Sequence, residues 1–270
     1  MADVITAREI ESLEFNEIRK SLAALTVTSM AKQGAERLLP SADCFVVERR
    51  LQETGEGRLL WSRGLFSLSP VEDISPLVVR AEKGGALQGS DLAAVGAFLK
   101  GVQRCRRFFQ DGGKAEMFPL MAGLALTMNG CAALSREMNR CIDSDGEVLD
   151  SASPELGTLR RRERRLQENI REKMDSYLRN PAQRRLLQEA IITIRGNRFV
   201  LPVKQEYSRQ IRGIVHDQSA SGATLFIEPL PVVQLQNELT GLQFEISREI
   251  ERILRLLSSR VAENGAALHS

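Results

Sequence analysis

The fold of this 270-residue chain is decided by the stretch Ile191-Ile192-Thr193-Ile194-Arg195-Gly196-Asn197-Arg198-Phe199-Val200-Leu201-Pro202-Val203. β-Branched and other apolar residues dominate both sides of Gly196-Asn197, which is the two-residue signal of a tight β-hairpin. Downstream, two further apolar runs at 211–218 and 224–227 flank Ser219-Ala220-Ser221-Gly222 and suggest a second hairpin. We therefore expect a small β tip over residues 190–229.

Pro202 constrains the first hairpin, because proline has no N–H to donate to a ladder. The strand that contains it is expected to be at a sheet edge or to end there.

Helical patterns lie on both sides of the tip. Ser153-Pro154 predicts a helix start, with serine as the cap and proline at the first position. Narrow apolar seams follow at helical spacing, first at Leu156, Leu159, Leu166, Ile170, Met174 and Tyr177, and then at Leu235, Leu239, Leu242, Ile246, Ile250, Ile253, Leu257 and Val261. A narrow seam needs a partner helix. We expect helices over 154–189 and 232–267 to pair as an antiparallel arm.

Residues 1–150 have a helical pattern of their own. Asp43 is a candidate cap for a helix that ends near Gly64, residues 65–76 suggest a loop, and Ser90 or Asp91 is a candidate cap for a helix through Phe109. The expected fold class is mainly α: a helical domain over 1–150 and, over 151–270, an antiparallel two-helix arm that carries a small β-hairpin tip.

The charge is unevenly distributed along the chain. Residues 155–215 contain fifteen basic and seven acidic residues, a net of +8, whereas the whole chain is only +2 and the remainder is therefore −6. Such a segment can be a solvated helix face with local ion pairs. Arg160–Arg165 contains five arginines and one glutamate, however, and the arginine fork suits phosphate. Aromatic residues are sparse, which favours binding to a duplex or structured backbone over base stacking.

Motifs for other chemistry are incomplete. Cys44, Cys105, Cys131 and Cys141 have no metal-binding spacing, so we expect reduced thiols and no metal site. Gly112-Gly113-Lys114 is followed by alanine and does not complete a phosphate loop, and Asp143–Glu147 fits a turn better than a calcium loop. His216 and Asp217 are adjacent and would point to opposite faces of a strand, so they are not expected to form a catalytic triad with Ser219 or Ser221.

Membrane insertion and secretion are not indicated. The longest weakly polar run, 118–128, is too short to cross a bilayer, and the start, with Asp3, Arg8 and Glu9, lacks a signal-peptide profile. We expect a cytoplasmic protein with no membrane partner.

The tip sequence closely resembles the second bacterial MutS lineage, the mismatch-repair paralogue. The resemblance rests on 190–207 and 213–229 and on shorter pieces at Ser12–Phe15, at 141–150 and at Glu249–Leu254. It implies that residues 1–150 form a helical core and lever and that 151–270 form a clamp. It also implies an ATPase module using ATP and magnesium, a nuclease domain and homodimerisation, all beyond residue 270.

The resemblance implies a role in suppressing recombination and in splitting stalled or collided ribosomes, through binding of branched or duplex DNA or of ribosomal RNA. No catalytic residue is assigned in this chain, so whether it is an enzyme is left open. The expected phosphate contacts are Arg160, Arg161, Arg164, Arg165, Arg195, Arg198, Lys204 and Arg212. The expected structural residues of the tip are Gly196, His216, Asp217, Ser221, Gly222 and Glu228.

Two alternatives remain open. The arm can be a protein-interaction or dimerisation module without nucleic-acid contact, in which case apolar residues should be exposed on the tip and binding should respond little to salt. An enzyme acting through His216 is the third reading, and it requires an activity that His216→Ala removes.

Overall fold

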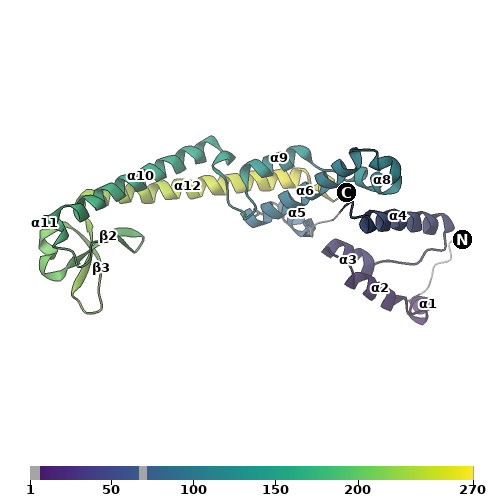
Figure 1. The fold of residues 1–270 in the computed structure, drawn as a ribbon, viewed down its shortest axis with the longest axis horizontal. Helices are drawn as coiled ribbons and strands as arrows, with labels where there is room; N and C mark the ends of the chain where they lie inside the picture. Colours follow the sequence, from purple (N-terminus) through teal and green to yellow (C-terminus); the bar gives the residue numbers. More distant parts are fainter. Residues whose placement is uncertain (1–6, 67–71, 270) are drawn as a thin grey trace. The chain divides into compact units, whose positions relative to one another are not determined.

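The computed structural model describes residues 7–66 and 72–269, and it is mainly α with one small antiparallel sheet (Figure 1). Residues 1–6, which include Asp3, and part of the loop predicted over 65–76 lie outside the described residues. The chain divides into two compact units, Met1–Leu149 with Leu254–Ser270 (unit 1) and Asp150–Ile253 (unit 2). The C-terminal 254–270 segment thus groups with the first unit.

The regular elements in the described part of unit 1 are helices, apart from one isolated bridge between Ile142 and Val148. Asp43 caps α4 as expected, because its carboxylate accepts hydrogen bonds from the amides of Phe45 and Val46. Its helices are α1 (Ala7–Ser12), α2 (Phe15–Ala24), α3 (Ser29–Glu36), α4 (Cys44–Ser62), α5 (Ser75–Glu82), α6 (Gly89–Gln110), α7 (Lys114–Met117), α8 (Pro119–Thr127), α9 (Ala132–Cys141), the end of α12 (Leu230–Glu263) and α13 (Gly265–Leu268).

Two starts in unit 1 differ from the prediction. The helix α5 begins inside the region predicted as loop, because Pro76 occupies its first turn, where a missing N–H costs nothing. The helix α6 begins earlier than predicted. Its cap is Gln88, whose main-chain N–H donates to the Asp91 carboxylate in a capping box.

The core of unit 1 forms around α6. One cluster contains Leu60, Cys105, Phe109, Phe118, Ala122 and Ala125. The predicted 143–147 turn is confirmed: Ile142 and Val148 form a bridge across it, and the Asp143 carboxylate accepts the amides of Asp145 and Glu147 at 2.9 and 2.8 Å.

In unit 2 the two seams pair as expected. The helix α10 (Pro154–Arg179) lies beside α12 (Figure 1). Their contacts run in opposite directions along the chain: Arg162 bonds Glu238 at 2.5 Å, whereas Ser153 bonds Glu249 at 2.6 Å. An earlier residue of α10 therefore meets a later residue of α12, which defines an antiparallel pair.

The helix limits differ from the predicted 154–189 and 232–267. Pro181 ends α10 at Arg179, because it lacks the N–H that would continue the helix, and Asn180 instead caps the single turn α11 (Pro181–Arg184). The helix α12 starts at Leu230, with Pro231 in its first turn, and ends at Glu263.

The tip is a sheet in the order β1-β2-β4-β3, made of β1 (Thr193–Arg195), β2 (Arg198–Lys204), β3 (Gly213–Gln218) and β4 (Thr224–Pro229). Both predicted hairpins are present. Gly196 and Asn197 both have positive φ, 54° and 62°, as the tight turn between β1 and β2 requires. The segment 205–210 between β2 and β3 is a 3-10 helix, η2 (Gln205–Gln210).

The prediction for Pro202, an edge strand or a strand that ends there, is wrong in both forms: β2 has partners on both sides, and it continues to Lys204, two residues beyond Pro202. The carbonyl of Pro202 accepts the amide of Gln188 at 2.8 Å, so its nitrogen, on the same side, also faces residues 186–188. The pairing there is a single bridge, Leu187 with Val203. The β2–β4 ladder on the other side loses no donor.

Candidate nucleic-acid interface

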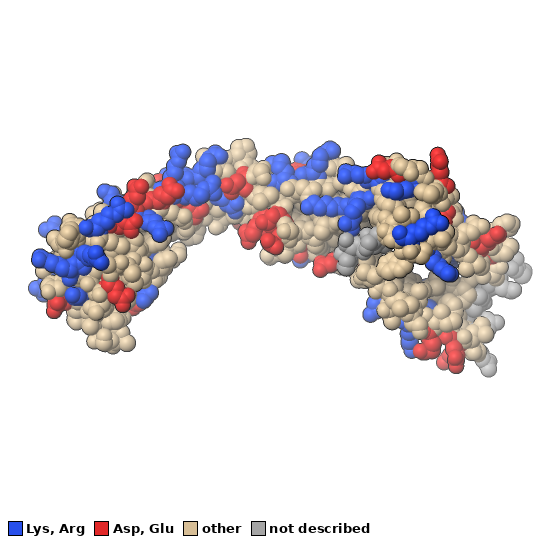
Figure 2. All heavy atoms as spheres, viewed as in Figure 1, with Lys and Arg blue, Asp and Glu red and all other residues tan. Residues whose placement is uncertain are grey.

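The helix α10 presents a charged face away from its partner. Leu166, Ile170 and Met174 are buried along its seam. Arg161 and Arg165 are exposed and lie about half a turn from that seam at 100° per residue. Figure 2 shows Lys and Arg side chains along the edge occupied by α10, with Asp and Glu side chains between them.

Two of the predicted contacts on α10 are held by one carboxylate. Arg160 and Arg164 bond the two oxygens of Asp150 at 2.8 and 3.2 Å. Hydrogen bonds from Arg160 and then Arg164 lower the pKa of Asp150 below its ordinary value, so it is ionised at neutral pH. The pair is thus partly neutralised and fixed against the start of the helix.

Arg195 on β1 is a brace across the sheet. Its Nε lies 3.2 Å from the Asp217 carboxylate on β3, at the opposite edge, and its guanidinium lies 4.1 Å from the centroid of the Phe226 ring on β4. Nη1 also donates to the hydroxyl of Thr193 and the carbonyl of Ile194, at 3.2 and 2.9 Å. Most of its donor capacity is used inside the tip.

A second brace is built on Glu228, a carboxylate only 1% exposed. One oxygen accepts from Arg198 at 3.3 Å, and the other lies 2.6 Å from His216 Nε2. Arg198 also donates to Asn237 on α12 at 2.7 Å. Pairing between β3 and β4 shifts between Val215 and Asp217, so His216 is the extra residue of a β-bulge. The bulge lets His216 and Asp217 engage different partners, Glu228 and Arg195.

The remaining tip residues have distinct places. Gly222 has a φ of 74° in the β3–β4 turn, and the Ser221 hydroxyl lies 3.4 Å from that of Ser219. Lys204 is half-buried, with Nζ 6.0 Å from the Tyr207 ring centroid, and Arg212 is exposed. Within the part of the chain that the structure describes, Arg165 and Arg212 form no ion pair, whereas Arg161 donates to Thr158 at 3.0 Å.

The structure therefore divides the predicted phosphate contacts into two groups. Arg160, Arg164, Arg195 and Arg198 are paired with carboxylates of the same unit. Arg161, Arg165, Lys204 and Arg212 have no such partner among the described residues. The predicted contacts omit Arg179, Arg184 and Arg185, which are exposed at the end of α10, at the end of α11 and directly after it. The sequence signal was present, because residues 176–188 contain no acidic residue.

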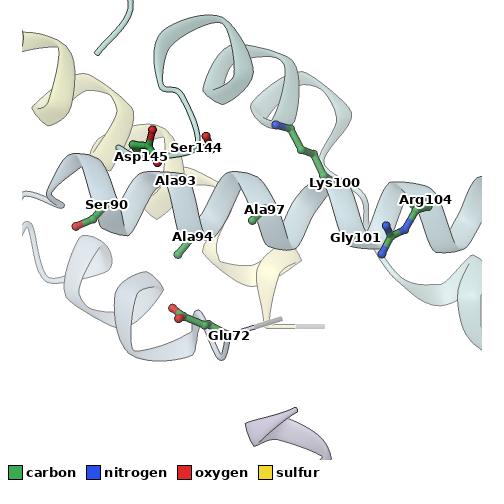
Figure 3. Close-up of a pocket in the computed structure, with 10 residues that line it drawn as sticks. All are labelled: Glu72, Ser90, Ala93, Ala94, Ala97, Lys100, Gly101, Arg104, Ser144 and Asp145. Atoms are coloured by element: carbon green, nitrogen blue, oxygen red, sulfur yellow. The ribbon is translucent and has the colours of Figure 1, made fainter. Parts of the chain in front are cut away.

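Unit 1 contains an open cleft of about 650 Å³ beside α6 (Figure 3). Lys100 and Arg104 project from α6, and Glu72 and Asp145 come from neighbouring segments. Because both signs of charge line the cleft, it favours neither an anion nor a cation. Within residues 7–66 and 72–269, no group of three or more His, Cys, Asp or Glu side chains is placed to hold a metal ion, and no helix is long and apolar enough to cross a membrane.

The fold and this surface define a class of protein: a helical unit with an antiparallel helix pair whose small sheet is braced by buried and half-buried ion pairs. A scan against models of protein families finds no match. The chain is 40% identical over 262 residues to endonuclease MutS2 of Symbiobacterium thermophilum, covering 97% of this chain and 32% of that protein. It is 39% identical over 260 residues to endonuclease MutS2 of Shouchella clausii, and the match covers 95% of this chain and 33% of that protein. The sequence belongs to the MutS2 family, and it spans about a third of the length of these relatives.

Proposed function

We propose that unit 2 binds the phosphate backbone of nucleic acid. The observation that carries the proposal is the set of exposed arginines on α10, α11 and the tip that have no carboxylate partner among the described residues. An arginine fork can bind two phosphate oxygens at once, and each neutralised phosphate releases counterions into solution. The relatives are named as endonucleases, which is consistent with a nucleic-acid ligand.

The wider role follows the family. Residues 1–150 would be the core and lever and 151–270 the clamp of a cytoplasmic homodimer that closes on branched or duplex DNA or on ribosomal RNA. In that setting the protein would suppress recombination or split collided ribosomes. ATP, magnesium and the nuclease chemistry would belong to the part of the relatives that this chain does not cover.

The test is a fluorescence-anisotropy titration of the full 270-residue chain with labelled duplex DNA, a four-way DNA junction and purified ribosomes between 50 and 200 mM salt. Three to four phosphate contacts predict a log–log slope of about −3 on duplex DNA, hence a loss of roughly 60-fold over that range. Arg209→Glu with Arg212→Glu, both exposed near β3, should weaken binding further. Arg248→Glu on α12 is the control for charge alone. Binding that is absent, or that salt and the tip variant leave unchanged, would refute the proposal.

One observation favours a second function, a protein-interaction module. Ile194, Ile214 and Val215 are 57%, 44% and 51% exposed on the two edge strands of the tip. An interface built on them would respond little to salt. Ile214→Ser with Val215→Ser would abolish partner capture by that module and would leave a nucleic-acid slope unchanged.

A further inference from the structure

The densest uncompensated charge of unit 2 lies where α10 gives way to the tip. Residues 176–188 contain Arg179, Arg184 and Arg185 and no aspartate or glutamate. All three arginines are exposed, and none forms an ion pair within the described residues. On α10, by contrast, Glu163, Glu168 and Glu172 lie among the arginines, and α12 supplies Glu238 to Arg162.

Local structure holds the Arg184–Arg185 pair outward. Pro181 ends α10, and the side chain of Asn180 accepts the amide of Ala182 at 2.9 Å, which caps α11. The next two residues, Leu186 and Leu187, are buried at 5% and 4% exposure. The turn is therefore anchored by its leucines, and the arginines immediately before them remain in solvent.

The anchor is also bonded to the sheet. The carbonyl of Leu186 accepts the amide of Lys204 at 3.0 Å, and Leu187 bridges Val203. These bonds place the backbone next to Arg185 at the end of β2, where Lys204 adds a further cation. The main chain that carries Arg184 and Arg185 is already held on both sides, so it loses little conformational freedom when the arginines bind a ligand.

We propose that Arg184 and Arg185, with Arg179 and Lys204 beside them, form the principal phosphate-binding site of unit 2. Its ligand is the phosphodiester backbone of DNA or RNA, and the inference rests on the proposed function above. The ion-paired residues Arg160, Arg164, Arg195 and Arg198 shape the unit and contribute little to binding.

The experiment compares two double variants of the full chain. One carries Arg184→Gln and Arg185→Gln together, and the matched control carries Arg161→Gln and Arg165→Gln together. Both pairs are exposed, carry two charges and lie in unit 2. The probes are a labelled 25-base-pair DNA duplex and an RNA hairpin. Loss of two phosphate contacts should lower the slope on the duplex by about 1.8 and the affinity at 0.1 M salt by roughly 60-fold, whereas the matched pair should lose about 3-fold or less.

The outcomes separate this inference from the proposed function. Equal losses in both double variants, or an unchanged slope in the Arg184 and Arg185 variant, would overturn the inference while wild-type binding still supports the proposed function. Failure of the wild type to bind either probe would overturn both. If the Arg184 and Arg185 variant loses the same affinity for the DNA duplex and the RNA hairpin, the site binds a backbone feature common to DNA and RNA. If it loses affinity for one probe alone, that nucleic acid is the ligand. Circular dichroism melting that is unchanged in both variants shows that folding is not the cause.

Discussion

Replacing the buried Glu228 by glutamine should loosen the whole tip. The substitution keeps the shape of the side chain but removes the charge that Arg198 and His216 contact, at 3.3 and 2.6 Å. Breaking a buried ion pair by removing one partner costs about 3–5 kcal/mol, because the other charge is left buried. The side chains of Arg198 and His216 are each 24% exposed, and Arg198 keeps its bond to Asn237. Water can therefore solvate the remaining groups in part, and we expect about 2–3 kcal/mol.

Amide hydrogen exchange read by mass spectrometry is the suitable assay, because it resolves unit 2 from unit 1 in one sample. Peptides covering β1 to β4 should exchange roughly 30- to 150-fold faster in Glu228→Gln, whereas peptides of α6 should be unchanged. Glu245→Gln is the control, since Glu245 is exposed on α12 and its substitution should change exchange less than about 3-fold.

The brace also predicts coupling. Arg198→Gln and Glu228→Gln should cost less together than the sum of the two alone, because each removes the same interaction. Additive effects, or a change in the β1–β4 peptides no larger than that of the control, would refute the argument that Glu228 holds the strands together.

Three further predictions concern single positions. Gly213→Ala should destabilise the tip by about 2 kcal/mol or more in urea unfolding, because its Cβ would lie 2.3 Å from a main-chain oxygen of β4; Gly241→Ala, with nothing within 4 Å, should instead be neutral or stabilise α12 by up to about 1 kcal/mol. Arg252, and more weakly Ser153, lower the pKa of Glu249, so its contribution to stability is full above the ordinary value and is lost as pH falls through the lowered one. The melting temperatures of wild type and Glu249→Gln should therefore converge as the pH falls below about 4.5, and a difference that stays constant with pH would count against the pairing. Asp150→Asn removes the carboxylate that holds Arg160 and Arg164, and it should tighten binding to duplex DNA about 2- to 5-fold in an anisotropy titration. An unchanged affinity would contradict this prediction.

Local signals were enough to predict the elements. The Gly196-Asn197 turn, the Asp43 cap and the apolar seams depend on residues a few positions apart, and all are present. The prediction erred where one residue type serves two purposes. Pro76 closes the predicted loop but lies in the first turn of α5, and the predicted helix over 154–189 runs through Asn180-Pro181, although that pair interrupts the apolar seam and ends α10 at Arg179.

The site could be predicted only in outline. Charge counting found the basic segment, but the partners of its arginines are distant in sequence: Asp150 lies ten residues from Arg160, and Asp217 lies 22 residues from Arg195. Tertiary folding brings these carboxylates to the arginines, and no local spacing rule reveals that. The arginines proposed here as the phosphate site, Arg179, Arg184 and Arg185, carry a signal that local sequence does show, because residues 176–188 contain no acidic residue.

The braces change what the charge of the basic segment means. Residues 155–215 carry +8, yet unit 2 as a whole contains seventeen basic and fourteen acidic residues, a net of +3, because α12 and the second hairpin add carboxylates. A polyanion approaching within a Debye length of about 8 Å responds to the local surface and not to the sum over the unit. Arginines paired with Asp150, Asp217 and Glu228 are screened from it by those carboxylates. The attractive field of unit 2 is therefore concentrated on the arginines that lack a carboxylate. Arg161 and Arg165 also lack one, but Glu163 and Glu168 lie close to them on α10, whereas residues 176–188 around Arg184 and Arg185 contain no acidic residue. Substituting Arg184 and Arg185 is therefore expected to matter more than substituting Arg161 and Arg165.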